Sequence, residues 1–143
     1  MNIASLRQDA DSGSVVAQTT LGICYLEGID VEMDYKEAFR FLSAAAEKGA
    51  SRAQANLARI HADGLGVPKN TTQAIRLYEK AAIAGEFYAQ VELGRLYSSG
   101  EEVPADPVAA LKWYSAAAAQ QAKVANCDEL KEACAYVGRA LRT

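Results

Sequence analysis

The stretch AQVELGRLYSSGEEVPADPVAALKWYSAAA, residues 89–118, decides the fold of this chain, because its pattern occurs twice more at intervals of 36 residues. The register does not slip between copies. The aligned sets include Ala17, Ala53 and Ala89; Leu21, Leu57 and Leu93; Gly28, Gly64 and Gly100; and Asp34, Asn70 and Asp106. A fixed period of this length indicates a protein built from stacked structural repeats.

Each repeat has the pattern of two helices joined by a turn. In the first helix, apolar residues such as Ala17, Leu21 and Tyr25 recur every four residues, and Gly28 follows as a left-handed C-cap. Within this helix a small residue recurs, which predicts a close approach by another helix. The small residues are Gly22, Ala58 and Gly94.

The second helix has its own start signals. Asp34 with Glu37 and Asn70 with Gln73 have the spacing of capping boxes, and Asp106 precedes a proline. Gly49 and Gly85 end the apolar stripes of the first two copies. The aromatic residues at these phases are expected in the core: Tyr25, Phe41, Tyr78, Tyr97, Trp113 and Tyr114.

The pattern predicts one all-α domain over residues 1–143, an α/α right-handed solenoid of about three repeats with terminal capping helices. The predicted repeats are 17–52, 53–88 and 89–121. Residues 1–13 match the second helix of a preceding half repeat. Residues 122–143 are expected to hold a C-terminal cap helix that begins at Asn126 or Cys127.

These residues make the chain similar to the Sel-1-like repeat family, relatives of the tetratricopeptide repeats. The resemblance rests on segments such as ARIHADGLGV, residues 58–67, and covers residues 17–121. Some positions depart from the family pattern and bring the geometry of the loops into question. They are Ala58 and His61 in the first helix of the second repeat, Asp30 and Glu102 in the loops, and Gln121 at the end of the third repeat.

The amino-acid composition excludes several classes of function. The 143 residues include 15 Lys and Arg against 18 Asp and Glu, a net charge of −3 that argues against nucleic-acid binding. No apolar run is long enough for a membrane span and no secretory signal is visible. We expect a monomer in the cytoplasm, unless a signal segment has been removed, and the resemblance implies a bacterial source. The three cysteines, Cys24, Cys127 and Cys134, fit no disulfide framework and no zinc pattern. Cys127 and Cys134 are expected to pack as small apolar residues, and a redox or metal role is the alternative.

The inventory of reactive groups predicts no enzyme, no metal and no cofactor. His61 is the only histidine and occupies the phase of Tyr25 and Tyr97, which favours a packing role. No phosphate-binding loop is present. A cysteine-rich branch of the resembled family is linked to β-lactam binding, which makes a β-lactam-binding hydrolase the remote alternative. The chain lacks the S-x-x-K and K-T-G motifs of such enzymes.

The resemblance places partner binding on the concave face formed by the first helices. Carried over from the tetratricopeptide relatives, this face displays Thr19, Ile23, Leu26 and Glu27; Ala55, Arg59, Ala62 and Asp63; and Val91, Arg95, Ser98 and Ser99. Arg52 and Tyr88 open the second and third of these helices on the same side. The predicted partner-binding residues are Ile23, Leu26, Arg52, Arg59, Asp63, Tyr88 and Arg95.

The arginines at this face allow two interpretations. Arg59 and Arg95 hold the same phase, and forked guanidinium donors suit acidic side chains or a C-terminal carboxylate of a bound peptide. Alternatively, Arg59 pairs with Asp63 and Arg95 with Glu92 on a solvated helix face.

The resulting hypothesis is a non-catalytic protein-interaction module that binds a peptide or protein segment. The resemblance suggests a bacterial adaptor, regulator or effector-type scaffold. An immunity protein that neutralises a bacterial toxin is the alternative.

Overall fold

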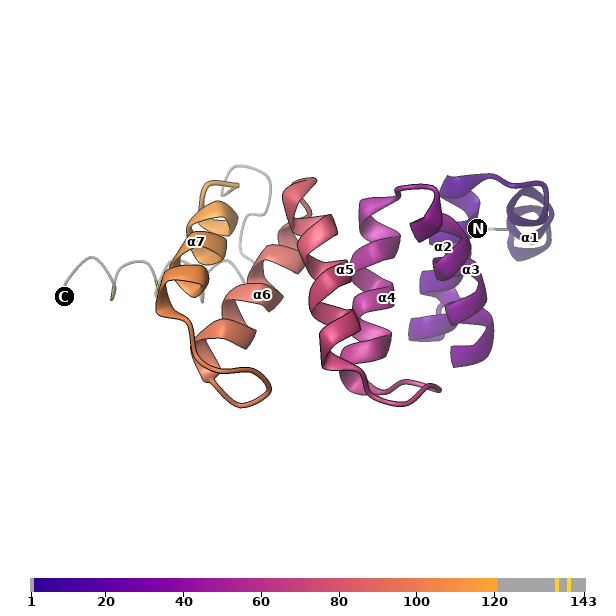
Figure 1. Cartoon of the computed structure of the whole chain (residues 1–143). Coiled ribbons are helices and arrows are strands. Elements are labelled where there is room, and N and C mark those ends of the chain that lie inside the picture. Colours follow the sequence, from indigo (N-terminus) through magenta and orange to yellow (C-terminus); the bar gives the residue numbers. More distant parts are fainter. Residues whose placement is uncertain (1, 121–135, 137–138, 140–143) are drawn as a thin grey trace. The chain divides into compact units, whose positions relative to one another are not determined.

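The computed structural model describes residues 2–120, 136 and 139, and every element within this part is an α-helix (Figure 1). The helices are α1 (Ile3–Asp11), α2 (Val15–Glu27), α3 (Tyr35–Glu47), α4 (Ser51–Asp63), α5 (Thr71–Ile83), α6 (Phe87–Ser99) and α7 (Pro107–Ala118). The predicted all-α repeat fold is confirmed. We call α2, α4 and α6 the first helices, and α3, α5 and α7 the second helices.

The helices form two compact units, residues 1–81 and 82–143. In the first unit α2 packs against α1 and α3, and α3 packs against α4. Its fully buried large side chains are Leu21, Leu42, Ile60 and Tyr78. In the second unit α6 packs against α7. The fully buried large side chains there are Val91, Leu93 and Tyr114.

Small residues set the distance between paired helices, as the sequence predicts. A Cβ atom on Gly22 would lie 2.6 Å from Cγ of Leu42, and one on Gly94 would lie 2.8 Å from the Tyr114 ring. Both separations are shorter than real side-chain contacts, so the pairs α2–α3 and α6–α7 need glycine at their crossings. In α4 the same phase is held by Ala58, which is fully buried.

The turns between first and second helices depend on left-handed backbone. Gly28, Gly64 and Gly100 cap the first helices with φ of 70°, 66° and 70°. In the following loop Gly66 has φ 73°, and Asp30, which replaces glycine at that phase, has φ 58°. Because aspartate tolerates this region better than most residues, the loop of the first repeat keeps the same left-handed turn.

The predicted N-caps of the second helices form, but the reciprocal half of the capping box does not. Oδ1 of Asp34 accepts the backbone N–H groups of Lys36 and Glu37 at 3.0 and 3.2 Å. Asn70 and Asp106 cap in the same way. In a complete capping box Glu37 would accept the backbone N–H of Asp34, but that N–H donates to the carbonyl of Tyr25 at 3.0 Å. The N–H groups of Asn70 and Asp106 likewise donate to the carbonyls of His61 and Tyr97.

The aromatic residues expected in the core are buried, except that Tyr97 is half-buried. The predicted cap helix from Asn126 or Cys127, with Cys134, lies outside the described residues apart from positions 136 and 139. Tyr136 packs on the core of the second unit, with its ring 4.7 Å from that of Tyr114.

Candidate functional site

A cavity lies between the first helices α2 and α4 of the first unit. It has a volume of about 190 Å³ and is lined by Thr20, Ile23, Cys24, Ile29 and Arg52. Two of the residues predicted for partner binding, Ile23 and Arg52, therefore line one cavity although they are far apart in the sequence. The first-helix face, as used below, means this cavity and the exposed residues of α2 and α4 around it.

One wall of the cavity is apolar. Ile23 is half-buried, and Ile29, on the turn after α2, keeps 46% of its surface exposed. Met33, further along that turn, is 53% exposed. Burial raises the pKa of the Cys24 thiol, and the charge of Asp30 acts in the same direction. The thiol is therefore neutral near pH 7, so it contributes apolar surface and no nucleophilic thiolate.

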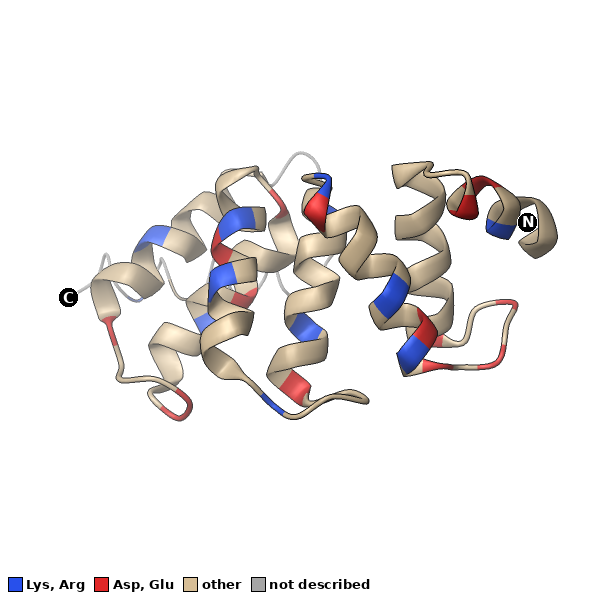
Figure 2. Ribbon diagram, turned by 45° about the vertical axis from the view of Figure 1, so that its right-hand side comes forward, with Lys and Arg blue, Asp and Glu red and all other residues tan. Residues whose placement is uncertain are grey.

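The other wall carries a positive charge. Arg52 lies in the first turn of α4 and is exposed, and it forms no ion pair with any residue in the described part of the chain. The N-cap residue of α4, Ala50, has no side chain that caps the helix, so the first N–H groups of α4 add positive partial charge beside Arg52. Charges of both signs occur elsewhere on the helices (Figure 2). The cavity thus combines an apolar surface with a cation available to an anionic group.

Arg59 connects the same two helices. Its guanidinium forms ion pairs with Glu27 of α2 and, at 3.9 Å, with Asp63 one turn further along α4. A third of the Arg59 side chain is exposed. The pairing with Asp63 that the sequence allows is present, and the contact with Glu27 adds a second carboxylate. A partner carboxylate at Arg59 has to compete with both.

Two predicted site residues, Tyr88 and Arg95, lie in the second unit. Arg95 on α6 is exposed and forms an ion pair with Glu92 of the same helix. Tyr88, in the first turn of α6, is half-buried. Their part in partner binding stays a prediction.

The first helices are rotated relative to the expectation carried over from the tetratricopeptide relatives. Leu26 is only 3% exposed, so the prediction that it lies on the binding surface is wrong. It lies one turn beyond Gly22, on the stripe that faces α3, where an apolar side chain gains from burial. The other expected groove residues that lie on this stripe are buried for the same reason: Thr19, Ala55 and Val91.

Sequence reasoning missed a set of glutamines that holds the repeats together. The side-chain amides of Gln18, Gln54 and Gln90 donate to the carbonyls of Ala10, Ala46 and Ala82 at 3.1, 3.4 and 3.1 Å. Each bond ties the start of a first helix to the end of the preceding helix and gives a terminal carbonyl a second donor, beside the backbone N–H of the glycine three residues further on. The signal was available, because these glutamines recur at the 36-residue period.

The seven described helices and their 36-residue period define an all-α repeat protein. A scan of family models matches the Sel1 repeat at residues 15–49, 51–86 and 87–121. The chain therefore belongs to the Sel1 repeat family. Sel1 repeat proteins generally mediate protein–protein interactions, and their fold is typically a non-catalytic scaffold.

Two solved structures are similar to this chain. A Sel1 repeat protein from Oxalobacter formigenes is 43% identical, with a TM-score of 0.73, and the match covers 92% of this chain and 96% of that one. The protein c5321, a protective antigen present in uropathogenic Escherichia coli strains and displaying an SLR fold, is 29% identical with a TM-score of 0.80. That match covers 98% of this chain and 33% of the longer protein. A search of curated proteins finds no match. Among the described helices, none is long and apolar enough to cross a membrane.

Proposed function

We propose that the first-helix face binds a segment of a partner protein that presents an apolar side chain next to a carboxylate. The observation that supports this proposal is the cavity between α2 and α4, where Ile23 lies on one surface with Arg52, which pairs with no carboxylate among the described residues. The carboxylate belongs to an acidic side chain or to the C-terminus of the segment.

The apolar wall and the Arg52 wall of the cavity bind different groups of the partner. The apolar side chain of the partner enters between Ile23 and Ile29, where it displaces water from apolar surface. The partner carboxylate then meets the forked donors of Arg52. Because Arg52 is exposed, this contact contributes only about 1 kcal/mol or less, so charge selects the segment while apolar burial supplies most of the affinity.

The surface around the cavity extends this contact. Met33 adds apolar area beside Ile29, and Arg59 holds Glu27 and Asp63 in place at the edge. Tyr88 and Arg95 belong to the second unit and are proposed as a separate partner contact there. This function corresponds to a bacterial adaptor or regulator that acts by binding.

The test begins with the partner itself, obtained by affinity purification and mass spectrometry from the cells that make this protein. Calorimetry with the purified partner then compares wild type with Arg52→Glu, which we expect to raise Kd about tenfold, or about 1.4 kcal/mol. Added salt weakens the wild-type complex more than the Arg52→Glu complex, since exposed charge pairs are screened.

The matched control is Lys36→Glu, a charge reversal at an exposed lysine on the second helix α3. We expect this variant to bind like wild type. If Arg52→Glu binds normally and Lys36→Glu does not, the partner uses the second-helix face and the proposal is wrong.

A further inference from the structure

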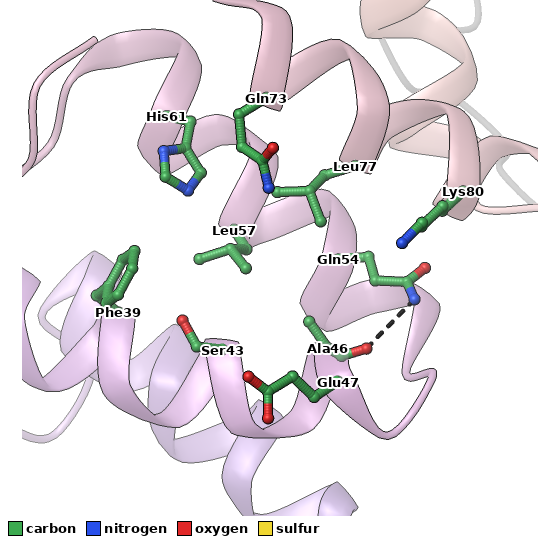
Figure 3. A pocket seen from close by; sticks show the side chains of 10 residues that line it. All are labelled: Phe39, Ser43, Ala46, Glu47, Gln54, Leu57, His61, Gln73, Leu77 and Lys80. Atoms are coloured by element: carbon green, nitrogen blue, oxygen red, sulfur yellow. Dashed lines mark hydrogen bonds between the residues drawn. The ribbon is translucent and has the colours of Figure 1, made fainter. Parts of the chain in front are cut away.

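A second, larger cavity lies on the opposite set of helices in the first unit (Figure 3). It has a volume of about 310 Å³, and its walls are α3 and α5, with α4 behind them. That volume is at the lower end of the range of about 300–1,000 Å³ for small-molecule pockets. The floor is apolar and consists of Leu57 and Leu77.

Among the polar side chains around this cavity, Gln54 donates to the Ala46 carbonyl (Figure 3), whereas four others have no such partner in the described part of the chain. Ser43 and Glu47 from α3, and Gln73 and Lys80 from α5, line it. Their side chains make no hydrogen bond or ion pair with other residues of the described part. Glu47 and Lys80 therefore present opposite charges to one cavity without neutralising each other.

The other repeats show that these residues are not needed for packing. The positions 36 residues before and after Lys80 are Ala44 and Ala116. The positions 36 and 72 residues after Glu47 are Ile83 and Ala119. The charged pair is thus specific to this one cavity.

Histidine at position 61 leaves unfilled a space that a larger side chain would occupy, as it does in the other repeats. The corresponding residues of the first and third repeats are Tyr25 and Tyr97, which are larger than histidine. The His61 ring lies edge-on to Phe39, with 5.9 Å between ring centroids. Figure 3 shows these two rings at one end of the cavity, with Lys80 and Glu47 toward the other. Burial lowers the pKa of His61, so its imidazole is neutral near pH 7 and this end is uncharged.

We propose that this cavity binds a small zwitterion, a free α-amino acid or dipeptide with an aromatic or large apolar side chain. The ligand ammonium lies against the Glu47 carboxylate, and the ligand carboxylate against the Lys80 ammonium and the Gln73 amide. The ligand side chain extends over Leu57 toward Phe39 and His61. Glu47 and Lys80 are both exposed, so each charge contact contributes about 1 kcal/mol or less; a ligand with both charges gains both contacts, whereas a singly charged ligand gains one.

Calorimetry with the full-length protein tests this proposal. The probes are L-phenylalanine and the dipeptide alanyl-phenylalanine, each against its singly charged forms, the N-acetyl acid and the amide. We expect saturable binding of at least one zwitterion, and up to about fivefold weaker binding of its N-acetyl and amide forms. If neither zwitterion binds, or if both singly charged forms bind as tightly as the zwitterion, the proposal is wrong.

The variants come from the chain's own repeats, so they are compatible with the fold. Lys80→Ala and Glu47→Ala copy Ala44 and Ala119, and His61→Tyr copies Tyr25 and fills the cavity. The two alanine variants are expected to raise Kd for the zwitterion up to about fivefold and His61→Tyr about tenfold or more, while Lys36→Ala, outside the cavity, leaves it unchanged. Binding that survives His61→Tyr and Lys80→Ala places the ligand elsewhere and overturns the assignment. Partner capture through the first-helix face is a separate property, so either result leaves that proposal to its own test.

Discussion

The absence of a side chain at Gly94 determines how closely α6 and α7 approach. The space that a Cβ atom would need there is occupied by the ring of Tyr114, a residue with 1% exposure. Gly22 and Leu42 repeat the arrangement in the first unit. Because such interiors are close-packed, a larger residue at these positions forces the helices apart.

Replacing Gly94 tests this contact. We expect Gly94→Trp to lower the free energy of unfolding by about 1–3 kcal/mol or more, because the new side chain overpacks the crossing. Thermal melting followed by circular dichroism gives the effect. Ser98→Trp, on the exposed side of the same helix, serves as the control and should leave the midpoint nearly unchanged. Equal midpoints for wild type and Gly94→Trp would show that the crossing is not close.

His61 gives the stability of the protein a specific pH dependence. Burial lowers its pKa, so the folded protein binds this proton more weakly than the unfolded chain does. The His61 contribution to the free energy of unfolding is therefore fully present above about pH 6.5 and is lost as pH falls through the folded-state pKa.

We expect the melting temperature of wild type to fall more than that of His61→Tyr when the pH is lowered from about 7.5 to about 5.5. The chain has no other histidine, so the difference between the two proteins reports His61. Calorimetric melts at several pH values provide the comparison. Parallel pH profiles would contradict the burial of this imidazole in the folded protein.

At the scale of helices, the repeats are joined by hydrogen bonds that use the same atoms in each copy. Gln18 is buried, and its amide donates to the carbonyl of Ala10 at the end of α1. Lys48 in turn donates to the Gln18 side-chain oxygen at 3.4 Å and to the Gly13 carbonyl at 2.9 Å. This network fixes the junction of α1, α2 and α3.

Removing the amide tests the network. Gln18→Leu keeps the side-chain bulk but removes one of the two donors to the Ala10 carbonyl, which keeps the backbone N–H of Gly13 at 3.0 Å, so we expect a loss of about 0.5–1.5 kcal/mol of unfolding free energy. Urea denaturation measures this loss. Gln8→Leu, at an exposed position on α1, is the control. A Gln18→Leu protein as stable as the Gln8→Leu protein would show that the bond contributes nothing.

The helix starts were predictable because capping is local: a side chain and a backbone N–H three residues away are enough. The second half of the capping box was not predictable from spacing, because the turn brings the Tyr25 carbonyl to the N–H that Glu37 would have used. Leu26 illustrates the same limit, since the rotation of α2 depends on the packing of Gly22 against Leu42.

For the whole molecule, the 36-residue period predicts the all-α Sel1 repeat fold, since stacking is the one way such units bury their apolar faces. The candidate site was predictable only in part. Ile23 and Arg52 line the same cavity, as a shared binding surface requires. Arg59 and Arg95 instead form ion pairs with acidic side chains of this chain. The ion pair of Arg59 with Glu27 joins two repeats, so it follows from how α2 and α4 lie together and not from spacing along one helix.

Site-specific photo-crosslinking in the cells that make this protein tests the central claim, that the first-helix face binds a protein segment. A benzophenone amino acid replaces Ile23 in one variant and Lys36 in another, and adducts are separated and sequenced. The account predicts a defined adduct from the Ile23 position that disappears when Arg52→Glu is added, and none from the Lys36 position. A partner adduct from the Lys36 position alone, or one from the Ile23 position that is unaffected by Arg52→Glu and by added salt, would contradict it.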